Sequence, residues 1–352
     1  MIRNEQSPLR LTSSILIECG SNRISSRSVS WNSSGSYLAM ASSDRMARLW
    51  TIEASGSARE VLVVSGHAGP VTKVRFHPSE PNHLCTAAAD QTVRLWDVRQ
   101  ATQRPTGRID LQKGSGPVAV EWNRTSSLLA VAEREGSILI YDTRKLGGAF
   151  SHASGSAAGS SASPLLSIEV APNTTESYHF SPCGNFLIAG WTREGEGIGE
   201  LRILSLKTAN NHTLFSSSYP AHSGPIYAMH VSLDSLRLAT GGADAMVGIW
   251  NLDTMCCTHS ITRRVKFIRS VGFSHDSRIL ATSSEEDGID LADARDGSEV
   301  GSVNLGTRPR AGGAEEIAWH PKSHILACAR TDAGPIGPPL SPIIVVKISV
   351  NV

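Results

Sequence analysis

The chain has 352 residues, 40% hydrophobic and 18% charged, and its 33 basic and 32 acidic side chains leave a formal net charge of +1. This balance gives no support to a large basic surface for nucleic-acid phosphates, so we expect any RNA contact to be weak or indirect. No apolar run is long enough to cross a bilayer, and the opening MIRNEQSPLR lacks the hydrophobic segment of a secretory signal, so we expect an intracellular protein without membrane contact.

The first predicted strand, Ser14–Cys19 (SILIEC), precedes a sevenfold repeat. The repeat is marked by an apolar, mostly aromatic residue that recurs every 42 to 58 residues, at Trp31, Phe76, Trp122, Phe180, Val231, Phe273 and Trp319. Each marker is followed by a short polar turn and a second apolar run, such as HPSEPN and HLCTAA in the second repeat. Repeats of about 40–45 residues built from short strands are typical of β-propeller blades. The sequence therefore predicts an all-β, seven-bladed β-propeller.

The second and fifth repeats show the strand plan most clearly. In the second repeat we expect strands at Val71–Phe76, Leu84–Ala88 and Thr92–Trp96, because apolar and β-branched residues alternate there with Gly, Pro, Asp and Ser turns. A fourth, outer strand follows the third strand of a blade, as at Val61–Val64 and Cys256–Ile261.

Two segments interrupt the repeat. Residues 147–164 are almost all Gly, Ala and Ser, a composition typical of a flexible loop. Residues 331–342 form a Pro- and Gly-rich insertion before the final predicted strand, Ile343–Ser349. We expect residues 1–352 to form a single domain, in which Ser14–Cys19 pairs with this final strand and closes the ring, so that no long sheet edge is left open.

The sequence shows no cofactor or metal motif and no catalytic residues. Its six cysteines are scattered over different repeats and are expected to be reduced and buried: Cys19, Cys85, Cys183, Cys256, Cys257 and Cys328. The run from Cys256 to His259 matches no standard zinc spacing, and consecutive strand residues point to opposite faces. No small-molecule substrate is expected.

Two repeats carry the same four polar residues: a His, a Thr, an Asp four residues after the Thr, and a Trp six residues after the Asp. They are His67, Thr86, Asp90 and Trp96 in one repeat, and His222, Thr240, Asp244 and Trp250 in the other. This pattern resembles that of WD-repeat propellers. The resemblance implies a buried network in which Asp accepts a hydrogen bond from His, and Thr links His to the indole N–H. Such a network is structural rather than catalytic, since buried polar groups are costly without partners.

Other repeats keep only part of this set. The first has Met40 at the threonine position, and the sixth has Thr282 but Ala292 where the tryptophan is expected. These blades are expected to rely on apolar packing.

Three segments, 77–99, 238–253 and 271–297, give the chain a closer resemblance to the WD-repeat subunits of THO complexes. The resemblance extends from about Ser28 to Val350 and includes the unusual Ile-Asp-Leu-Ala of the sixth repeat. It implies a non-catalytic scaffold in the assembly that couples transcription to mRNA processing and export. The implied partners are the other THO complex subunits and, through them, an RNA helicase and an export adaptor, and the implied location is the nucleus.

An alternative function rests on Trp96-Asp97-Val98-Arg99 and Tyr141-Asp142-Thr143-Arg144. Both resemble the box by which WD-repeat substrate receptors dock the adaptor of cullin-4 ubiquitin ligases, where Arg99 and Arg144 would make bidentate contacts. The simpler interpretation is that each arginine caps a turn.

The acidic run Glu285, Glu286 and Asp287 is a further candidate for partner binding. It lies in a predicted turn near the channel mouth of the sixth blade, where it would either receive a basic peptide or simply be solvated.

Overall fold

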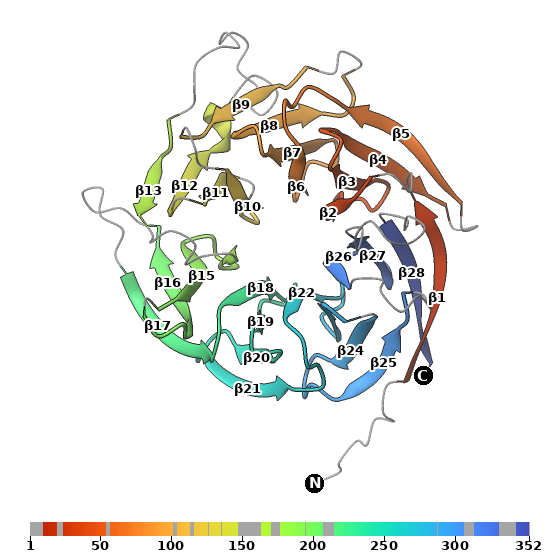
Figure 1. Cartoon of the computed structure of the whole chain (residues 1–352), viewed down its shortest axis with the longest axis vertical. Coiled ribbons are helices and arrows are strands. Elements are labelled where there is room, and N and C mark those ends of the chain that lie inside the picture. Colours follow the sequence, from red (N-terminus) through yellow and green to blue (C-terminus); the bar gives the residue numbers. More distant parts are fainter. Residues whose placement is uncertain are drawn as a thin grey trace.

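The structure, a computed structural model, describes most of the chain: residues 10–19, 24–53, 57–100, 104–112, 116–125, 127–134, 136–146, 163–169, 177–193, 195–206, 215–286, 288–305, 313–330 and 343–351. These residues form a closed ring of seven four-stranded antiparallel sheets around a central channel (Figure 1). The seven-bladed β-propeller predicted from the repeat is therefore confirmed. The described part of the chain contains no helix with the length and apolar character that a membrane crossing requires.

The first strand of each blade lies at the channel and the fourth at the rim. The first three blades consist of β2 (Ser26–Trp31), β3 (Leu38–Ser42), β4 (Ala47–Ile52) and β5 (Ala58–Val64); β6 (Val71–Phe76), β7 (His83–Ala88), β8 (Thr92–Asp97) and β9 (Gly107–Asp110); and β10 (Pro117–Trp122), β11 (Leu128–Glu133), β12 (Ser137–Asp142) and β13 (Leu166–Glu169). A 3₁₀ turn, η1 (Thr143–Lys145), follows β12.

The remaining blades follow the same order. They consist of β14 (Tyr178–Phe180), β15 (Phe186–Thr192), β16 (Gly199–Ser205) and β17 (Phe215–His222); β18 (Ile226–Val231), β19 (Arg237–Gly242), β20 (Val247–Asn251) and β21 (Cys256–Ile261); β22 (Ile268–Phe273), β23 (Ile279–Ser284), β24 (Ile289–Asp293) and β25 (Glu299–Val303); and β26 (Ala314–Trp319), β27 (Ile325–Arg330), β28 (Ile343–Asn351) and β1 (Arg10–Cys19).

The seventh blade closes the ring by joining both ends of the described chain. β1 pairs antiparallel with β28, from Arg10 opposite Asn351 to Cys19 opposite Ile343. Closure by the N-terminal strand is therefore confirmed, although both strands are longer than the sequence predicts. The interruption at 331–342 and nearly all of that at 147–164 lie outside the described residues.

The recurring aromatic markers tie neighbouring blades together. Trp122 donates its indole N–H to the Arg75 carbonyl at 3.4 Å, and Trp319 donates to the Gly272 carbonyl at 2.8 Å, in each case on the first strand of the preceding blade. Trp31 makes the same bond to Ala318 across the closing seam, at 3.2 Å. The marker position is therefore the one that joins the blades through apolar packing and an indole hydrogen bond.

The antiparallel order gives the ring two different faces. The segments that link blades and the turns between second and third strands lie on one face, here called the linker face. The turns between first and second strands, and between third and fourth strands, lie on the other, here called the turn face.

Two cysteine positions agree with the sequence expectation and three do not. Cys85 and Cys328 are buried, whereas Cys183, Cys256 and Cys257 are exposed, and all five are free thiols. Cys183 lies in a turn, and the other two lie on the rim strand β21, where only one of the six residues is buried.

Candidate partner-binding surfaces

The two complete polar sets meet as hydrogen-bonded networks. In the second blade, His67 Nδ1 lies 3.0 Å from Asp90 Oδ2, and His67 Nε2 lies 2.7 Å from Thr86 Oγ1. Trp96 donates its indole N–H to the same Thr86 hydroxyl at 2.8 Å. An ionised carboxylate can only accept hydrogen bonds, so the imidazole proton lies on Nδ1, facing Asp90, and Nε2 accepts the hydrogen of the Thr86 hydroxyl.

The fifth blade repeats this geometry. His222 Nδ1 lies 2.9 Å from Asp244 Oδ1, and His222 Nε2 lies 2.8 Å from Thr240 Oγ1. Trp250 donates to Thr240 at 3.0 Å. Burial opposes ionisation of Asp244, but the hydrogen bonds from His222 and from the backbone N–H groups of Met246 and Ser223 together lower the carboxyl pKa.

Each aspartate also holds the linker that enters its blade. Asp90 accepts the backbone N–H of Ala68 at 2.9 Å, and Asp244 accepts that of Ser223 at 3.0 Å. The carboxylates therefore fix the linker to the turn between the second and third strands, which suits a structural role on the linker face.

Two degenerate blades keep complementary halves of the network. The indole nitrogen of Trp50 in the first blade and the hydroxyl of Thr282 in the sixth are buried without a hydrogen-bond partner among the described residues. Met40 lies where Trp50 would find a threonine, and Ala292 lies where Thr282 would find a tryptophan. Both blades rely on apolar packing here, and each keeps one polar atom of the network without a hydrogen-bond partner among the described residues.

The two arginines of the possible ligase box fold back on their own blades. The Arg99 guanidinium binds both carboxylate oxygens of Asp97, at 3.0 and 2.8 Å, and Arg144 binds Asp142 at 2.9 and 2.7 Å. The arginine side chains are 63% and 73% exposed, on the turn face. These hydrogen bonds are the largest cause of the lowered pKa of each aspartate.

The sixth blade contains the same closed pair without the aromatic residue of the box. Arg295 binds Asp293 at 3.0 and 2.7 Å, after Ala292 rather than Trp or Tyr. The Asp–Arg pair therefore forms even where the aromatic residue of the ligase box is absent. This favours a turn-capping role over adaptor docking for Arg99 and Arg144 as well.

The acidic turn of the sixth blade has arginine partners. Glu286 accepts the Val265 N–H at 2.9 Å and an Arg264 N–H at 3.2 Å, and Glu285 forms an ion pair with Arg269. Burial opposes ionisation of Glu286, but the hydrogen bonds from Val265 and Arg264 outweigh it and lower the pKa. Glu286 thus holds its linker as Asp90 does, while Asp287 lies outside the described residues.

An apolar and aromatic patch lies beside this turn on the linker face. Val265 and Phe267 are 85% and 43% exposed, although both are large hydrophobic residues. The Tyr227 ring lies 5.9 Å from that of Phe267, and the Arg269 guanidinium lies 5.4 Å from the Tyr227 ring. We call Val265, Phe267, Tyr227 and Arg269 the linker-face patch. An exposed cluster of this kind is typical of a protein–protein contact.

The backbone brings two patch residues to the channel mouth through β-bulges. Pairing in the fifth blade shifts between Ile226 and Ala228, which leaves Tyr227 as the extra residue of β18. The corresponding shift in β22 leaves Arg269 as the extra residue. A bulge redirects a side chain from the regular strand alternation. Sequence reasoning missed both residues because it treated the inner strands as regular.

Charged side chains in the channel wall connect distant blades. Arg75 of β6 forms an ion pair with Glu316 of β26 and also lies 3.8 Å from Glu121 of β10. Glu121 in turn lies 3.3 Å from His179 of β14. Burial opposes the charge of Glu316, but the charges of Arg75 and Lys73 hold its pKa at about 2. The wall lines an open cavity of about 380 Å³, and the charged residues Arg75 and Glu316 in it are paired with each other.

The family model described as "WD domain, G-beta repeat" matches residues 18–51, 58–97 and 210–251. The second and third matches contain the two complete His–Thr–Asp–Trp networks. The chain folds as a seven-bladed β-propeller and contains WD40 repeats.

Among known proteins, the propeller is similar to "THO complex subunit 3" of Arabidopsis thaliana, with 26% identity over 88% of this chain and 87% of that protein. It is also similar to "WD repeat-containing protein AAC3" of Dictyostelium discoideum, with 22% identity over 91% of this chain and 66% of that protein. "Coronin-7" of Homo sapiens is 33% identical, but over only 30% of this chain and 12% of its own length. The similarity to the first two relatives extends around most of the ring.

Proposed function

We propose that this WD40 propeller is a non-catalytic scaffold subunit of a THO-type assembly that acts in nuclear mRNA processing and export. The observation that carries the proposal is the similarity to the Arabidopsis "THO complex subunit 3", which spans nearly the full length of both chains. A shared domain type would explain local matches such as that to "Coronin-7", whereas end-to-end similarity favours a shared role.

The geometry suits docking. A closed propeller is rigid, so it loses little conformational freedom when a partner binds. The linker-face patch offers exposed apolar and aromatic surface next to an arginine, the composition that is enriched at protein–protein contacts. We propose that this patch contacts another subunit of the assembly, and that an RNA helicase and an export adaptor are reached through that subunit.

Direct RNA binding is expected to be weak. The net charge of +1 provides little counterion release, and the channel arginine Arg75 is paired with Glu316. RNA would therefore reach the propeller through its partners.

The cullin-4 substrate-receptor hypothesis is the weaker of the two. It requires Arg99 and Arg144 to leave the carboxylates of Asp97 and Asp142, which hold both guanidinium groups in bidentate pairs. The same pair at Arg295, without the aromatic residue of the box, favours the turn-capping role.

The test is affinity purification of the tagged full chain from nuclear extract, followed by identification of the co-purified proteins. We expect the other THO subunits with the wild-type chain, and a loss of most of that signal for Val265→Ser/Phe267→Ser. The matched control is Leu165→Ser, which removes another hydrophobic residue, 56% exposed, from a different blade and is expected to bind normally. Depletion of the protein should retain polyadenylated RNA in the nucleus.

Two results would contradict the proposal. One is a purification without THO subunits. The other is recovery of a cullin-4 adaptor that depends on Arg99 and Arg144, shown by its loss in Arg99→Ala/Arg144→Ala.

A further inference from the structure

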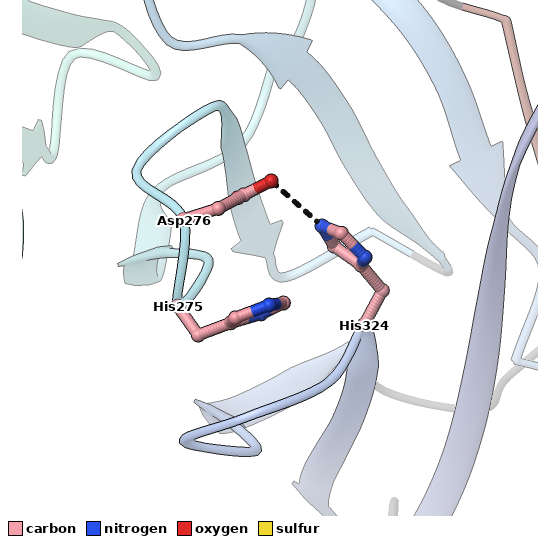
Figure 2. Close-up of side chains that lie close together, drawn as sticks. All are labelled: His275, Asp276 and His324. Carbon is pink, nitrogen blue, oxygen red and sulfur yellow. Dashed lines mark hydrogen bonds and ion pairs between the residues drawn. The ribbon is translucent and has the colours of Figure 1, made fainter. Parts of the chain in front are cut away.

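A cluster of metal-binding side chains lies on the turn face, away from the linker-face patch. His275 and Asp276 come from the turn between β22 and β23, and His324 comes from the turn between β26 and β27 (Figure 2). One donor atom from each residue lies within 4.8 Å of the other two. Figure 2 shows the Asp276 carboxylate and the two imidazole rings converging from these neighbouring turns.

The carboxylate is held in place by its own turn. Asp276 Oδ1 accepts the Ser274 hydroxyl at 2.6 Å and the Arg278 N–H at 3.2 Å. Its second oxygen, Oδ2, faces His324 Nε2 at 3.1 Å. One oxygen thus fixes the side chain, and the other remains directed into the cluster.

His275 is poorly explained as a simple structural residue. Its Nδ1 atom is buried and has no hydrogen-bond partner among the described residues. Its ring lies 4.6 Å from that of His324, at an angle of 61°. An unsatisfied buried nitrogen beside a second imidazole is costly unless something else compensates it. An ordinary hydrogen bond between His324 and Asp276 leaves this feature of His275 unexplained.

The neighbouring His320 makes a useful contrast. Its Nε2 donates to the Gly35 carbonyl at 3.1 Å, and its Nδ1 accepts the Ser323 hydroxyl at 2.8 Å. Both ring nitrogens are engaged, so His320 does not join the cluster. The donor set is therefore two imidazole nitrogens and one carboxylate oxygen.

We propose that His275, Asp276 and His324 form a zinc site that clasps the sixth and seventh blades together on the turn face. Two histidines and a carboxylate bind Zn²⁺ in known protein sites, with water in the fourth position. Ligands about 2.0–2.2 Å from a tetrahedral ion lie roughly 3.4 Å apart. Side-chain rotations that move the donor atoms by roughly an ångström would therefore bring the three ligands to bonding distance of the ion.

The test uses the full-length chain, freed of metal with a chelator and titrated with Co²⁺ as a spectroscopic substitute for Zn²⁺. We expect one equivalent to bind with the visible absorption of cobalt in a low-coordinate nitrogen and oxygen site, without a thiolate charge-transfer band. Zn²⁺ should displace the cobalt and raise the melting temperature by a few degrees at about a hundredfold excess over its Kd. His275→Ala and His324→Ala should each weaken cobalt binding at least about tenfold.

The control variant removes the other plausible metal ligands, on the rim strand β21: Cys256→Ser/Cys257→Ser/His259→Gln. It should bind cobalt as the wild type does. Asp276→Asn keeps an oxygen for the turn hydrogen bonds but removes the negative charge. If an alanine variant fails to fold, weaker cobalt binding by Asp276→Asn tests the site instead. The proposal is overturned if the wild type shows no saturable binding, if binding survives in His275→Ala and His324→Ala, or if the control variant loses it.

Discussion

At the residue scale, the buried carboxylates of the second and fifth blades act as connectors. Asp90 is bound at once by the His67 ring, by the Ala68 backbone and by the Thr92 hydroxyl, the last at 2.8 Å. Burial opposes its charge, yet these hydrogen bonds lower its pKa. One small side chain therefore fixes the linker, the turn and, through His67 and Thr86 in succession, the tryptophan of the third strand.

Removing this connector should destabilise the blade. Asp90→Ala or Asp244→Ala leaves a buried imidazole and a linker N–H unsatisfied, so we expect a loss of about 1–3 kcal/mol in the free energy of unfolding for each. Denaturant titration measures the loss. Asp110→Ala is the control, because Asp110 forms an exposed pair with Arg108 and such pairs contribute little. An unchanged stability in both network variants would refute the structural role.

The incomplete network of the sixth blade leads to the opposite expectation. Thr282→Val replaces a buried hydroxyl that has no partner among the described residues by a methyl group of similar size. We expect a gain of about 0.5–2 kcal/mol in the free energy of unfolding. Thr86→Val, at the equivalent position of a complete network, should lose about 1–3 kcal/mol because the Trp96 and His67 partners remain. Equal effects at the two positions would contradict the prediction.

At the scale of elements, one rim strand differs from the others. β1 belongs to the seventh blade but comes from the opposite end of the sequence, and it covers the outer edge of β28 (Figure 1). In the other six blades the fourth strand follows directly from the third. The seventh blade is thus the only one whose edge depends on a distant segment.

Deletion of residues 1–20 should therefore expose the edge of β28. Unpaired strand edges promote aggregation, so we expect a sharp loss of soluble monomer, measured by size-exclusion chromatography after expression. The control replaces residues 1–9 by an unrelated sequence and keeps β1. A truncated chain as soluble and as stable as the control would show that the ring closes without β1.

At the scale of the whole molecule, a buried histidine of the channel wall, His230, connects neighbouring blades. His230 of β18 lies against His179 of β14, with ring centroids 5.6 Å apart, and its Nδ1 accepts the Phe273 N–H at 3.2 Å. Burial is the main cause that lowers the His230 pKa from 6.5 to about 3, and the nearby charges of His179, Arg124 and Arg75 add to it. Protonation of Nδ1 would remove the lone pair that accepts the Phe273 N–H, and so would break this hydrogen bond between the fifth and sixth blades.

The stability of the propeller should therefore fall in mild acid. The folded-state pKa of His230 lies below its unfolded value, so the unfolded chain takes up the proton first. The contribution of His230 is complete above pH 6.5 and declines as the pH falls toward 3. Between pH 6.5 and 5 we expect His230 to account for a loss of up to about 2 kcal/mol. His230→Gln should flatten this slope in thermal unfolding, whereas the exposed control His259→Gln should keep it; equal slopes in both variants would exclude His230 as the cause.

Much of the fold follows from local patterns, and most of the surface does not. The repeat positions of Trp31 and Trp122 and the spacing of His67 to Asp90 are local features, so they predict the blades and the networks. The partners of the acidic turn could not be predicted, because Arg269 reaches Glu285 only through a bulge in β22. The channel pair could not be predicted either, because Arg75 and Glu316 come from the second and seventh blades and meet only when the ring is closed.

The pairing of β1 with β28 also has a consequence for biosynthesis. Most strand pairs join segments close in sequence and are complete soon after both strands leave the ribosome. Cys19 of β1, however, can pair only after Ile343 of β28 has been synthesised. At about 5–20 residues per second, the roughly 320 residues between them take about 15–65 s to synthesise. β1 is therefore made long before its partner β28, and the nascent chain carries an unpaired apolar segment while the strands between them are synthesised. A chaperone that shields β1 until β28 is made would therefore favour closure of the ring.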